Sequence, residues 1–332
     1  MWFGKNLTVF SKPHPALFSL YFPTICYTPN MPSSKNPKVL AIIGPTASGK
    51  TSLSIALAKQ FNGEVISADS RQVYRDMDLG TGKVTASEMQ GIPHHLIDVA
   101  DPATIYTGAD FKRDAEVALE DIIARRKLPI IAGGTFFYLE LLRGTMSTAP
   151  VPPDPELRAL LETKSTAELQ RQLVAADITH SAKIDINNRR RLMRAIEIIH
   201  TLGMIPPVES NTSPHDWLTI GIDITTDILA TRIHKRILQR IDQGMIEEVE
   251  KLHKEGVTWE RLDSFGLEYR YIARYLQGTI TREIMIEELS AKTRQFAKRQ
   301  RTWLKRDKSI QWFPFPIIEE DVEIVVRKFS ES

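Results

Sequence analysis

The sequence of 332 residues has very little cysteine, with Cys26 as its single thiol. One thiol excludes an internal disulfide and a cysteine-based structural zinc site, which fits a reducing compartment. Long hydrophobic runs are also missing, because the apolar stretch 16–27 is interrupted by Pro23 and is shorter than the ~20 residues that span a bilayer. The formal net charge is only +2, so net charge alone does not indicate a polyanionic partner. We therefore expect a cytoplasmic chain without a membrane segment.

Residues 1–37 contain no Asp, Glu or Arg, but several prolines and scattered aromatic residues. A secretory signal would need a cleaner apolar core, and a mitochondrial presequence would need arginines, so neither describes this segment. We interpret 1–37 as an extension that is either disordered or the product of a start site placed too early, with Met31 as the true beginning.

The stretch 44–51 reads GPTASGKT and matches the phosphate-loop pattern of Gly, any residues, Gly, Lys and Ser or Thr. It follows an apolar run at 39–43 and precedes a helical pattern at 52–60, which is the context that such a loop requires. Lys50 can neutralise a terminal phosphate, and the Thr51 hydroxyl can bind Mg²⁺. The predicted diphosphate-binding residues are Gly44, Pro45, Thr46, Ala47, Ser48, Gly49, Lys50 and Thr51.

Strands and helices alternate after the loop, in a chain with 42% hydrophobic and 25% charged residues. The pattern predicts buried strands at 39–43, 64–68, 128–132 and 217–224, and helices at 50–60 and 110–126. We expect an α/β fold: a P-loop NTPase-like parallel sheet flanked by helices, with an inserted helical subdomain. The predicted division is a catalytic core at 38–144 and 217–317, a helical insertion at 145–216, and a tail at 318–332.

Polar residues follow two further strands, at the sheet edge where parallel α/β folds bind ligands. Asp69 could be a Mg²⁺ ligand, a general base, or only the cap of the following turn. Gly133, Gly134 and Thr135 could form only a tight turn, or could let a ligand approach closely.

Basic residues cluster in two places. Arginines at 189–194 lie in a predicted helix at 187–201, which follows another predicted helix at 156–176; they could bind phosphates or form a solvated face. The segment 292–306 is basic without acidic residues, and its Phe296 and Trp303 are seven residues apart. We interpret these two aromatics as core residues and the basic face as RNA-binding.

The ordered motifs of the chain resemble those of the tRNA dimethylallyltransferase (tRNA isopentenyltransferase) family, of the bacterial type because no Cys/His zinc-finger extension follows. The resemblance extends from residue 38 to about 306. The motifs are GPTASGKT (44–51), DSRQVY (69–74), MDLGT (77–81), GIPHHL (91–96), GADF (108–111), GGT (133–135), RRLMR (190–194), RIHKR (232–236), MIEEV (245–249) and TRQFAKRQ (293–300).

The resemblance implies transfer of the dimethylallyl group from dimethylallyl diphosphate to N6 of adenine 37 in the tRNA anticodon stem-loop. By similarity, Asp69 would accept the N6 proton, Thr46 would contact the bridging oxygen, and Lys50 and Arg232 would meet the diphosphate charge. Mg²⁺, on Thr51, is the implied cofactor, and a monomer is the expected state. The implied tRNA-binding residues are Asp69, Ser70, Arg71, Gln72, Thr135, Arg190, Arg191, Leu192, Met193, Arg194, Lys298 and Arg299.

The chain departs from the family pattern at three places. Gly82 follows Gly80-Thr81 where alanine is usual, and Gly266-Leu267-Glu268-Tyr269-Arg270 stands where a shorter Gly-Tyr-Arg/Lys segment is expected. The insertion is shorter than usual, with 163–167 in place of a longer loop. Three other functions explain the sequence less completely. A small-molecule kinase would not explain the basic segments, an enzyme that prenylates free adenine nucleotides would not need them, and a non-catalytic RNA-binding module would not need Lys50, Thr51 and Asp69.

Overall fold

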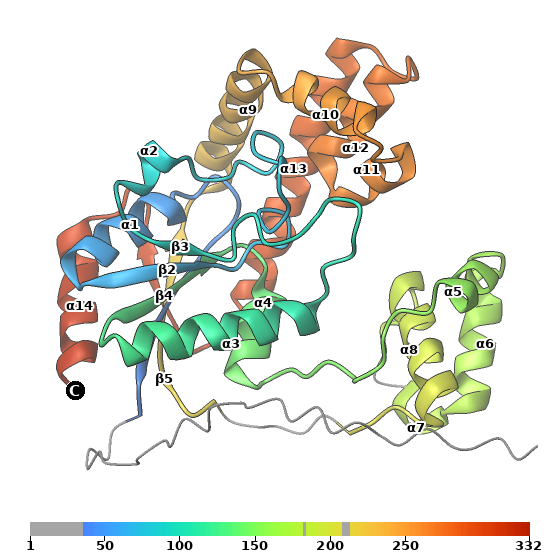
Figure 1. The fold of residues 1–332 in the computed structure, drawn as a ribbon, viewed down its shortest axis with the longest axis horizontal. Coiled ribbons are helices and arrows are strands. Elements are labelled where there is room, and N and C mark those ends of the chain that lie inside the picture. The colour runs from blue at the N-terminus through green and yellow to red at the C-terminus, as the bar shows by residue number, and fades with distance from the viewer. Residues whose placement is uncertain (1–35, 182–183, 208–212) are drawn as a thin grey trace, which may run out of the picture. The chain divides into compact units, whose positions relative to one another are not determined.

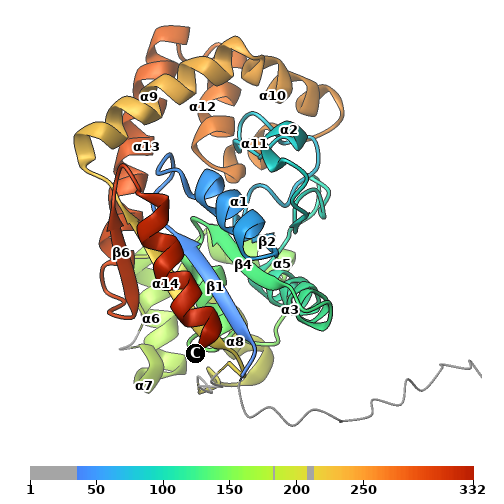
Figure 2. The same cartoon turned by 90° about the vertical axis from the view of Figure 1, so that its left-hand side faces the viewer.

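The computed structural model describes residues 36–181, 184–207 and 213–332, so the expectation for the N-terminal extension falls outside it except at 36 and 37. Within these residues the centre is a six-stranded sheet in the order β3-β2-β4-β1-β5-β6, with every pair parallel (Figures 1 and 2). The strands are β1 (Lys38–Ile43), β2 (Gly63–Ser67), β3 (His94–His95), β4 (Leu128–Gly133), β5 (Asp216–Asp223) and β6 (Ile310–Pro314). The predicted parallel α/β fold is confirmed, and its predicted strands are correct to within one residue.

Helices cover both faces of the sheet, because the strand residues that point to either face are apolar. On one face, Leu40 and Ile42 pack with α1 (Lys50–Gln60) and α14 (Glu319–Glu331). On the other, Val39 and Ala41 pack with α3 (Gly108–Ala124), α4 (Phe136–Arg143) and the end of α13 (Arg282–Leu304). The short α2 (Ala86–Met89) lies between β2 and β3 in the chain.

The predicted tail at 318–332 is wrong, because these residues form helix α14 in the layer beside α1. Val322 and Val326 are fully buried in the same cluster as Leu40. Lys38 at the start of β1 ties this helix down, since its ammonium donates to the carbonyl of Phe329 and to Ser332 Oγ. The i, i+4 spacing of the two valines is the helical signal that marks the segment as part of the core.

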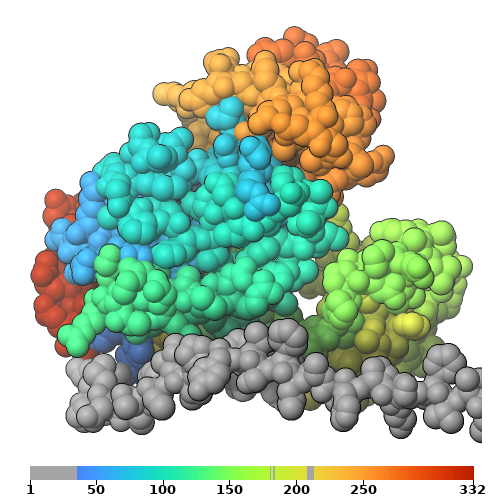
Figure 3. Space-filling model, viewed as in Figure 1, coloured from blue at the N-terminus to red at the C-terminus, as the bar shows by residue number. Residues whose placement is uncertain are grey.

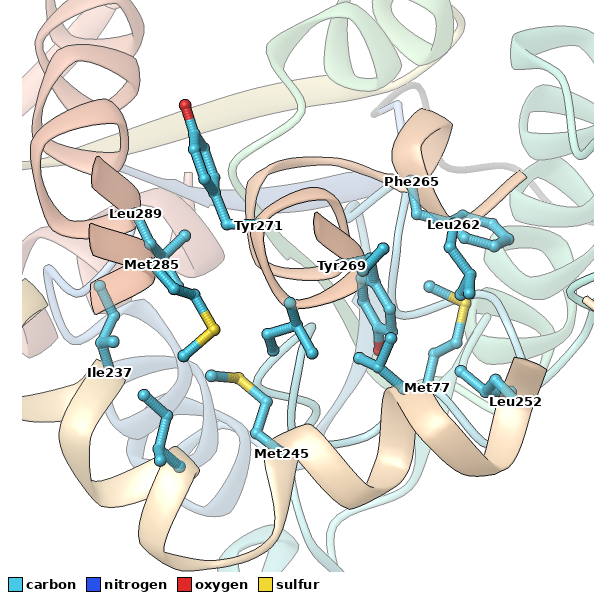
Figure 4. Packing of buried hydrophobic residues seen from close by; sticks show 14 of the residues in the cluster. Met77, Ile237, Met245, Leu252, Leu262, Phe265, Tyr269, Tyr271, Met285 and Leu289 are labelled. Atoms are coloured by element: carbon cyan, nitrogen blue, oxygen red, sulfur yellow. The ribbon is translucent and has the colours of Figure 1, made fainter. Parts of the chain in front are cut away.

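A second hydrophobic core lies among α9 (Thr226–Asp242), α10 (Met245–Lys254), α11 (Trp259–Phe265), α12 (Leu267–Leu276) and α13. Figure 4 shows Met245, Tyr269 and Met285 packed in its interior. The same cluster buries Val73, Tyr74 and Met77, which belong to the segment that follows β2. Figure 3 shows the segment that follows β2, in cyan, against the helices of this second core, in orange. This packing attaches the helices to the loop that carries Asp69.

Glu248 of α10 fastens the same segment by hydrogen bonds. Its carboxylate accepts from the backbone N–H groups of Asp78 (2.9 Å), Leu79 (2.6 Å) and Gly80 (2.9 Å), and from the Tyr269 hydroxyl (2.8 Å). Burial and this carboxylate together raise the pKa of Tyr269 well above its usual value. One side chain therefore satisfies backbone donors that no strand or helix ladder serves.

Replacing Glu248 with alanine is expected to lower the free energy of unfolding by about 2–4 kcal/mol, because several donors lose their acceptor at once. Glu248→Gln keeps one acceptor oxygen, so a smaller loss is expected. Urea unfolding checks both, with Glu247→Ala on the exposed side of α10 as the matched control, expected within about 0.5 kcal/mol of the wild type. Equal losses for the Glu248 and Glu247 alanine variants would contradict the assignment.

The insertion folds around its own small core. Its helices are α5 (Pro155–Glu162), α6 (Thr166–Ala176), α7 (Ile178–Ser181) and α8 (Arg189–Leu202), and Leu161, Leu169 and Leu173 pack between them. The single helix predicted at 156–176 is wrong, because Ser165 starts a new helix through a capping box with Glu168. The predicted helix at 187–201 is confirmed, with Asn188 as its N-cap.

Candidate active site

A cavity of about 600 Å³ lies at the carboxyl ends of the central strands. The ends of β1, β2 and β4 all contribute to it, as the parallel topology predicts. Helices α9, α12 and α13 close its other sides. Its lining includes Thr46, Ala47, Lys50, Thr51, Asp69, Ser70, Arg71, Gln72, Gly133, Gly134, Thr135, Arg236, Arg240, Glu268, Phe296, Arg299, Gln300 and Trp303.

Backbone carbonyls of the phosphate loop accept hydrogen bonds from the ammonium group of Lys50. Lys50 Nζ donates to the carbonyl oxygens of Gly44 (2.9 Å) and Pro45 (2.8 Å). Burial lowers the pKa of Lys50 to about 8, against the opposing effect of the nearby Asp69 carboxylate. The lysine is therefore a cation that lacks a carboxylate partner within ion-pair distance among the described residues, and an arriving phosphate can supply that charge.

The start of helix α1 also leaves hydrogen-bond donors without a side-chain partner among the described residues. Helix α1 begins without a side-chain cap at Gly49, whose φ of 100° favours glycine, so its first N–H groups remain available. Ser48 Oγ is buried and has no hydrogen-bond partner among the described residues. Free donors at a helix N-terminus, together with an orphaned hydroxyl, form a site for an oxyanion.

Asp69 both lines the cavity and caps the turn that follows β2. Its Oδ1 accepts from the backbone N–H of Arg71 at 2.9 Å, which is the capping role weighed from the sequence. Oδ2 takes part in no hydrogen bond among the residues described. The geometry therefore allows one oxygen to hold the turn and the other to act on a ligand.

Gly133 and Thr135 bring the end of β4 against the end of β2. A Cβ on Gly133 would lie 2.1 Å from the carbonyl oxygen of Ala68, so only glycine permits this approach. Thr135 N donates to that carbonyl (3.1 Å), and Thr135 Oγ1 accepts from Ser70 N (3.1 Å). The hydroxyl thus fixes the segment that carries Asp69.

Gln300 joins the two glycine-containing loops, a role that the sequence did not reveal. Its Oε1 accepts from Thr46 N (3.1 Å) and its Nε2 donates to the carbonyl of Gly134 (2.9 Å). A glutamine inside a basic helix gives no signal of such a bridge, because the partner loops are 166 and 254 residues away in the chain.

The arginines and the glutamine around the cavity differ in position: some line it and one lies outside its lining. Arg232 is outside the cavity lining; its Nε donates to the carbonyl of Ala47 (2.8 Å), so it supports the phosphate loop from behind. Arg71 lines the cavity, and burial lowers its pKa. Gln72 donates through Nε2 to the carbonyl of Gly82 (3.2 Å). Arg236 and Arg240 also line the cavity, although the sequence gave them no role.

The assignment of Phe296 and Trp303 to the core is wrong. Both line the cavity, Phe296 is 42% exposed, and Trp303 meets the ring of Phe136 edge-on with centroids 4.4 Å apart. The face of α13 that packs inward carries smaller residues such as Ala297. Arg299 lies at the cavity beside Phe296, whereas Lys298 is exposed outside its lining.

The arginines of the insertion divide into structural and exposed groups. Arg189 pairs with Glu162, and Arg194 pairs with the buried Glu197 and donates to the carbonyl of Val151 (2.8 Å). Arg190 and Arg191 are exposed on the first turn of α8 and make no ion pair among the described residues.

Leu192 and Met193 were expected to contact tRNA, but the structure contradicts this. Their side chains are only 0% and 6% exposed and pack in the core of the insertion. They therefore hold α8 in place and offer no contact surface. The same motif thus combines exposed cations with buried anchors.

Within the described ranges, no group of three or more His, Cys, Asp or Glu side chains could hold a metal ion by itself. Thr51 and Asp69 nevertheless supply hard oxygen atoms to the same cavity. Mg²⁺ is commonly bound by one or two such oxygens together with substrate phosphates and water, so the residues suit it. None of the helices in these ranges is long and apolar enough to cross a bilayer.

Comparison with known proteins gives consistent matches. The IPP transferase family pattern matches residues 72–307. The tRNA dimethylallyltransferase 2 of Treponema denticola is 47% identical over 272 residues, which cover 80% of this chain and 91% of that protein. The solved tRNA isopentenylpyrophosphate transferase of Bacillus halodurans aligns with a TM-score of 0.67 and 36% identity over 90% of this chain and 96% of its own. A eukaryotic dimethylallyltransferase, solved acting on tRNA, aligns with a TM-score of 0.70 and 28% identity over 84% of this chain and 74% of its own.

Proposed function

The chain belongs to the IPP transferase family, whose matched relatives are tRNA dimethylallyltransferases, and from that membership we propose how its site works. It is a prenyl-transferring enzyme that modifies tRNA. We propose that the donor is dimethylallyl diphosphate and that the acceptor is N6 of adenine 37 in the anticodon loop. Diphosphate is the leaving group.

One observation carries this proposal: the phosphate loop and Asp69 open into the same cavity. The loop offers an ammonium group and the free N–H groups at the start of α1, which suit a diphosphate. A carboxylate in the same cavity suits a proton acceptor for the second substrate. A cavity of about 600 Å³ is large enough for a prenyl group and a purine together.

In the proposed reaction, N6 attacks the allylic carbon, the carbon–oxygen bond to diphosphate breaks, and Asp69 takes the N6 proton. Lys50 and the helix N-terminus stabilise the negative charge that grows on the leaving oxygen. Thr46 stands at the bridging oxygen, and Arg232 acts by holding the loop through Ala47. Mg²⁺, held by Thr51 and phosphate oxygens, would supply further charge stabilisation.

The acceptor adenine has to leave the anticodon stack to reach Asp69, and extrusion from a loop costs less than from a duplex. Phe296 and Trp303 give the cavity an aromatic wall, against which an extruded base can stack. We propose that Ser70, Arg71 and Gln72 hold that base, and that Arg299 meets the RNA backbone beside the opening.

The decisive experiment incubates the purified chain with Mg²⁺ and labelled dimethylallyl diphosphate. Parallel reactions contain an anticodon stem-loop with adenine at position 37, the same stem-loop with guanine there, AMP, or ATP. Label in the adenine stem-loop alone is expected. Label in AMP would instead identify a cytokinin-type enzyme, and ATP consumption without prenyl transfer would identify a kinase.

Arg190 and Arg191 are proposed to contact tRNA phosphates. Each change to glutamine is expected to weaken stem-loop binding by about threefold to tenfold, and to lower the slope of log K against log salt by about 0.7–1. Fluorescence anisotropy at several salt concentrations measures both quantities. Arg282→Gln, an exposed arginine at the start of α13, is the matched control. Unchanged salt slopes in both insertion variants would place the RNA elsewhere.

A further inference from the structure

Helix α9 presents a row of arginines to the active site. Arg232, Arg236 and Arg240 recur every four residues and so share one face of the helix, about 6 Å apart along its axis. Arg232 is engaged by the Ala47 carbonyl. Arg236 and Arg240 line the cavity, yet neither makes a hydrogen bond or an ion pair among the described residues. Two unpaired guanidinium groups in one cavity indicate a multiply charged anionic ligand.

The partial burial of this pair has an electrostatic cost. Desolvation, together with the neighbouring guanidinium groups of Arg240 and Arg232, lowers the pKa of Arg236 to about 10. Like charges are held together here without a carboxylate within ion-pair distance in the described part of the chain. An arginine pair that is maintained under such repulsion is arranged for a ligand and not for the stability of the fold.

Gly82 provides the space in which Arg240 lies. A Cβ at this position would be 1.7 Å from Nη2 and 2.5 Å from Cζ of Arg240, so no other residue permits the present position of the guanidinium. The backbone φ of 62° also favours glycine. Gly82 is one of the departures from the family pattern, and its effect is to admit this arginine.

Glu268, which belongs to another departing segment, faces the same arginines from the start of α12. It lines the cavity, and burial raises the pKa of its carboxyl group; Arg240 and Arg236 oppose this shift, and Asp69 adds to it. No ion pair joins Glu268 to either arginine within the described residues. The carboxylate is therefore near enough to offset their charge but leaves their donors free for a ligand.

We propose that Arg240, placed by Gly82, is a further diphosphate-binding residue of this enzyme, and that Glu268 is a counter-charge whose repulsion of the bound diphosphate assists its release. This inference rests on the proposed function, since the ligand is the donor's diphosphate. The arginine row leads from the phosphate loop, where Lys50 holds one end of the ligand. A guanidinium can hold the outer phosphate by two parallel hydrogen bonds.

The test measures binding of inorganic diphosphate by calorimetry in the presence of Mg²⁺. Arg240→Gln is expected to weaken binding about tenfold, and Glu268→Gln to tighten it about threefold. Lys235→Gln removes a charge from an exposed position of the same helix and is the control, with an expected change below twofold. Opposite effects at 240 and 268 would not arise from a general loss of structure.

Gly82→Ala tests the placement of the arginine. Its Cβ displaces the guanidinium without removing a charge, so it is expected to weaken diphosphate binding about as much as Arg240→Gln does. The double variant Gly82→Ala/Arg240→Gln is expected to bind diphosphate no worse than Arg240→Gln alone, because no guanidinium remains for the Cβ at position 82 to displace. Additive losses would overturn the link between the two residues.

Stem-loop binding tests whether Arg240 binds an RNA phosphate instead of diphosphate. If Arg240→Gln weakens stem-loop binding and leaves diphosphate binding unchanged, the arginine binds an RNA phosphate and the proposal is wrong. Equal diphosphate affinities for Arg240→Gln and Lys235→Gln would also overturn it. Diphosphate binding does not require turnover, so a wild-type protein that transfers no label would refute the proposed function while leaving this test valid.

Discussion

Replacing Asp69 with asparagine is expected to lower the rate of prenyl transfer by about 10²–10⁴-fold at saturating donor and stem-loop. The exocyclic nitrogen of adenine is a weak nucleophile, and it becomes effective only as its proton leaves. Asp69 Oδ2 is the free carboxylate oxygen that can take this proton. Asparagine cannot accept it, so chemistry should slow while the substrates still bind.

Asparagine is the informative substitution because it separates the two roles of the residue. Its side-chain oxygen can still accept from the backbone N–H of Arg71, which lies 2.9 Å from Oδ1 in the present structure. The turn after β2 should therefore stay intact, and dissociation constants for diphosphate and stem-loop should change by less than about threefold. Single-turnover rates and binding isotherms on the same preparation measure both.

An Asp69→Asn protein that transfers the prenyl group at the wild-type rate would reduce Asp69 to a cap. Asp69→Ala adds a check on structure, since it removes the cap and the base together. It is expected to be as slow as the asparagine variant but less stable by about 0.5–2 kcal/mol. Loss of activity in Ala together with full activity in Asn would assign the whole effect to the turn.

The sequence predicted the parts of the site that depend on local pattern. A phosphate loop can be recognised in the sequence because its glycines, lysine and threonine must be close together in the chain to surround an anion. Asp69 and Thr135 were found for a related reason: parallel strands end at one sheet edge, so the residues after them converge. Their direct contact, through Thr135 Oγ1 and Ser70 N, follows from that topology.

Parts that depend on distant segments were not predictable in the same way. Gln300, Arg236 and Arg240 reach the cavity only because α9 and α13 cross beside it, and their spacing alone fits any solvated helix. The heptad spacing of Phe296 and Trp303 was misread, since a face that lines a cavity has the same period as one that packs in a core. The RRLMR motif mixes both environments within one helical turn.

The departures at Gly82 and Glu268 show what one sequence can add once a structure is known. They lie 186 positions apart in the chain, and the sequence alone gives no structural reason for either residue. Gly82 leaves a space, and the guanidinium of Arg240 occupies it; Glu268 supplies the opposite charge nearby. Each change is interpretable only through the third residue, because the physical unit is the group of three and not any one position.

Replacing Lys50 with methionine is expected to lower kcat/KM for the donor by about 10²–10³-fold, because the cation that stabilises the leaving diphosphate is lost. The pH dependence of the wild type gives an independent check. Burial lowers the pKa of Lys50 to about 8, so its ammonium group is present below that pH and is lost as the pH rises through it. Diphosphate affinity should therefore fall by up to tenfold per pH unit between about 8 and 9.5.

Lys50→Arg distinguishes this titration from any other in the site. Guanidinium stays charged across the range, so the variant should bind diphosphate more weakly than the wild type at pH 7, owing to its different shape, but with an affinity that is flat up to pH 9.5. Arg236, whose pKa is lowered to about 10, stays largely charged up to pH 9.5, and the small slope that it adds is common to both proteins. A wild-type profile as flat as that of Lys50→Arg would mean that the loop holds its lysine fully protonated, and that the carbonyls of Gly44 and Pro45 offset the burial of the ammonium group.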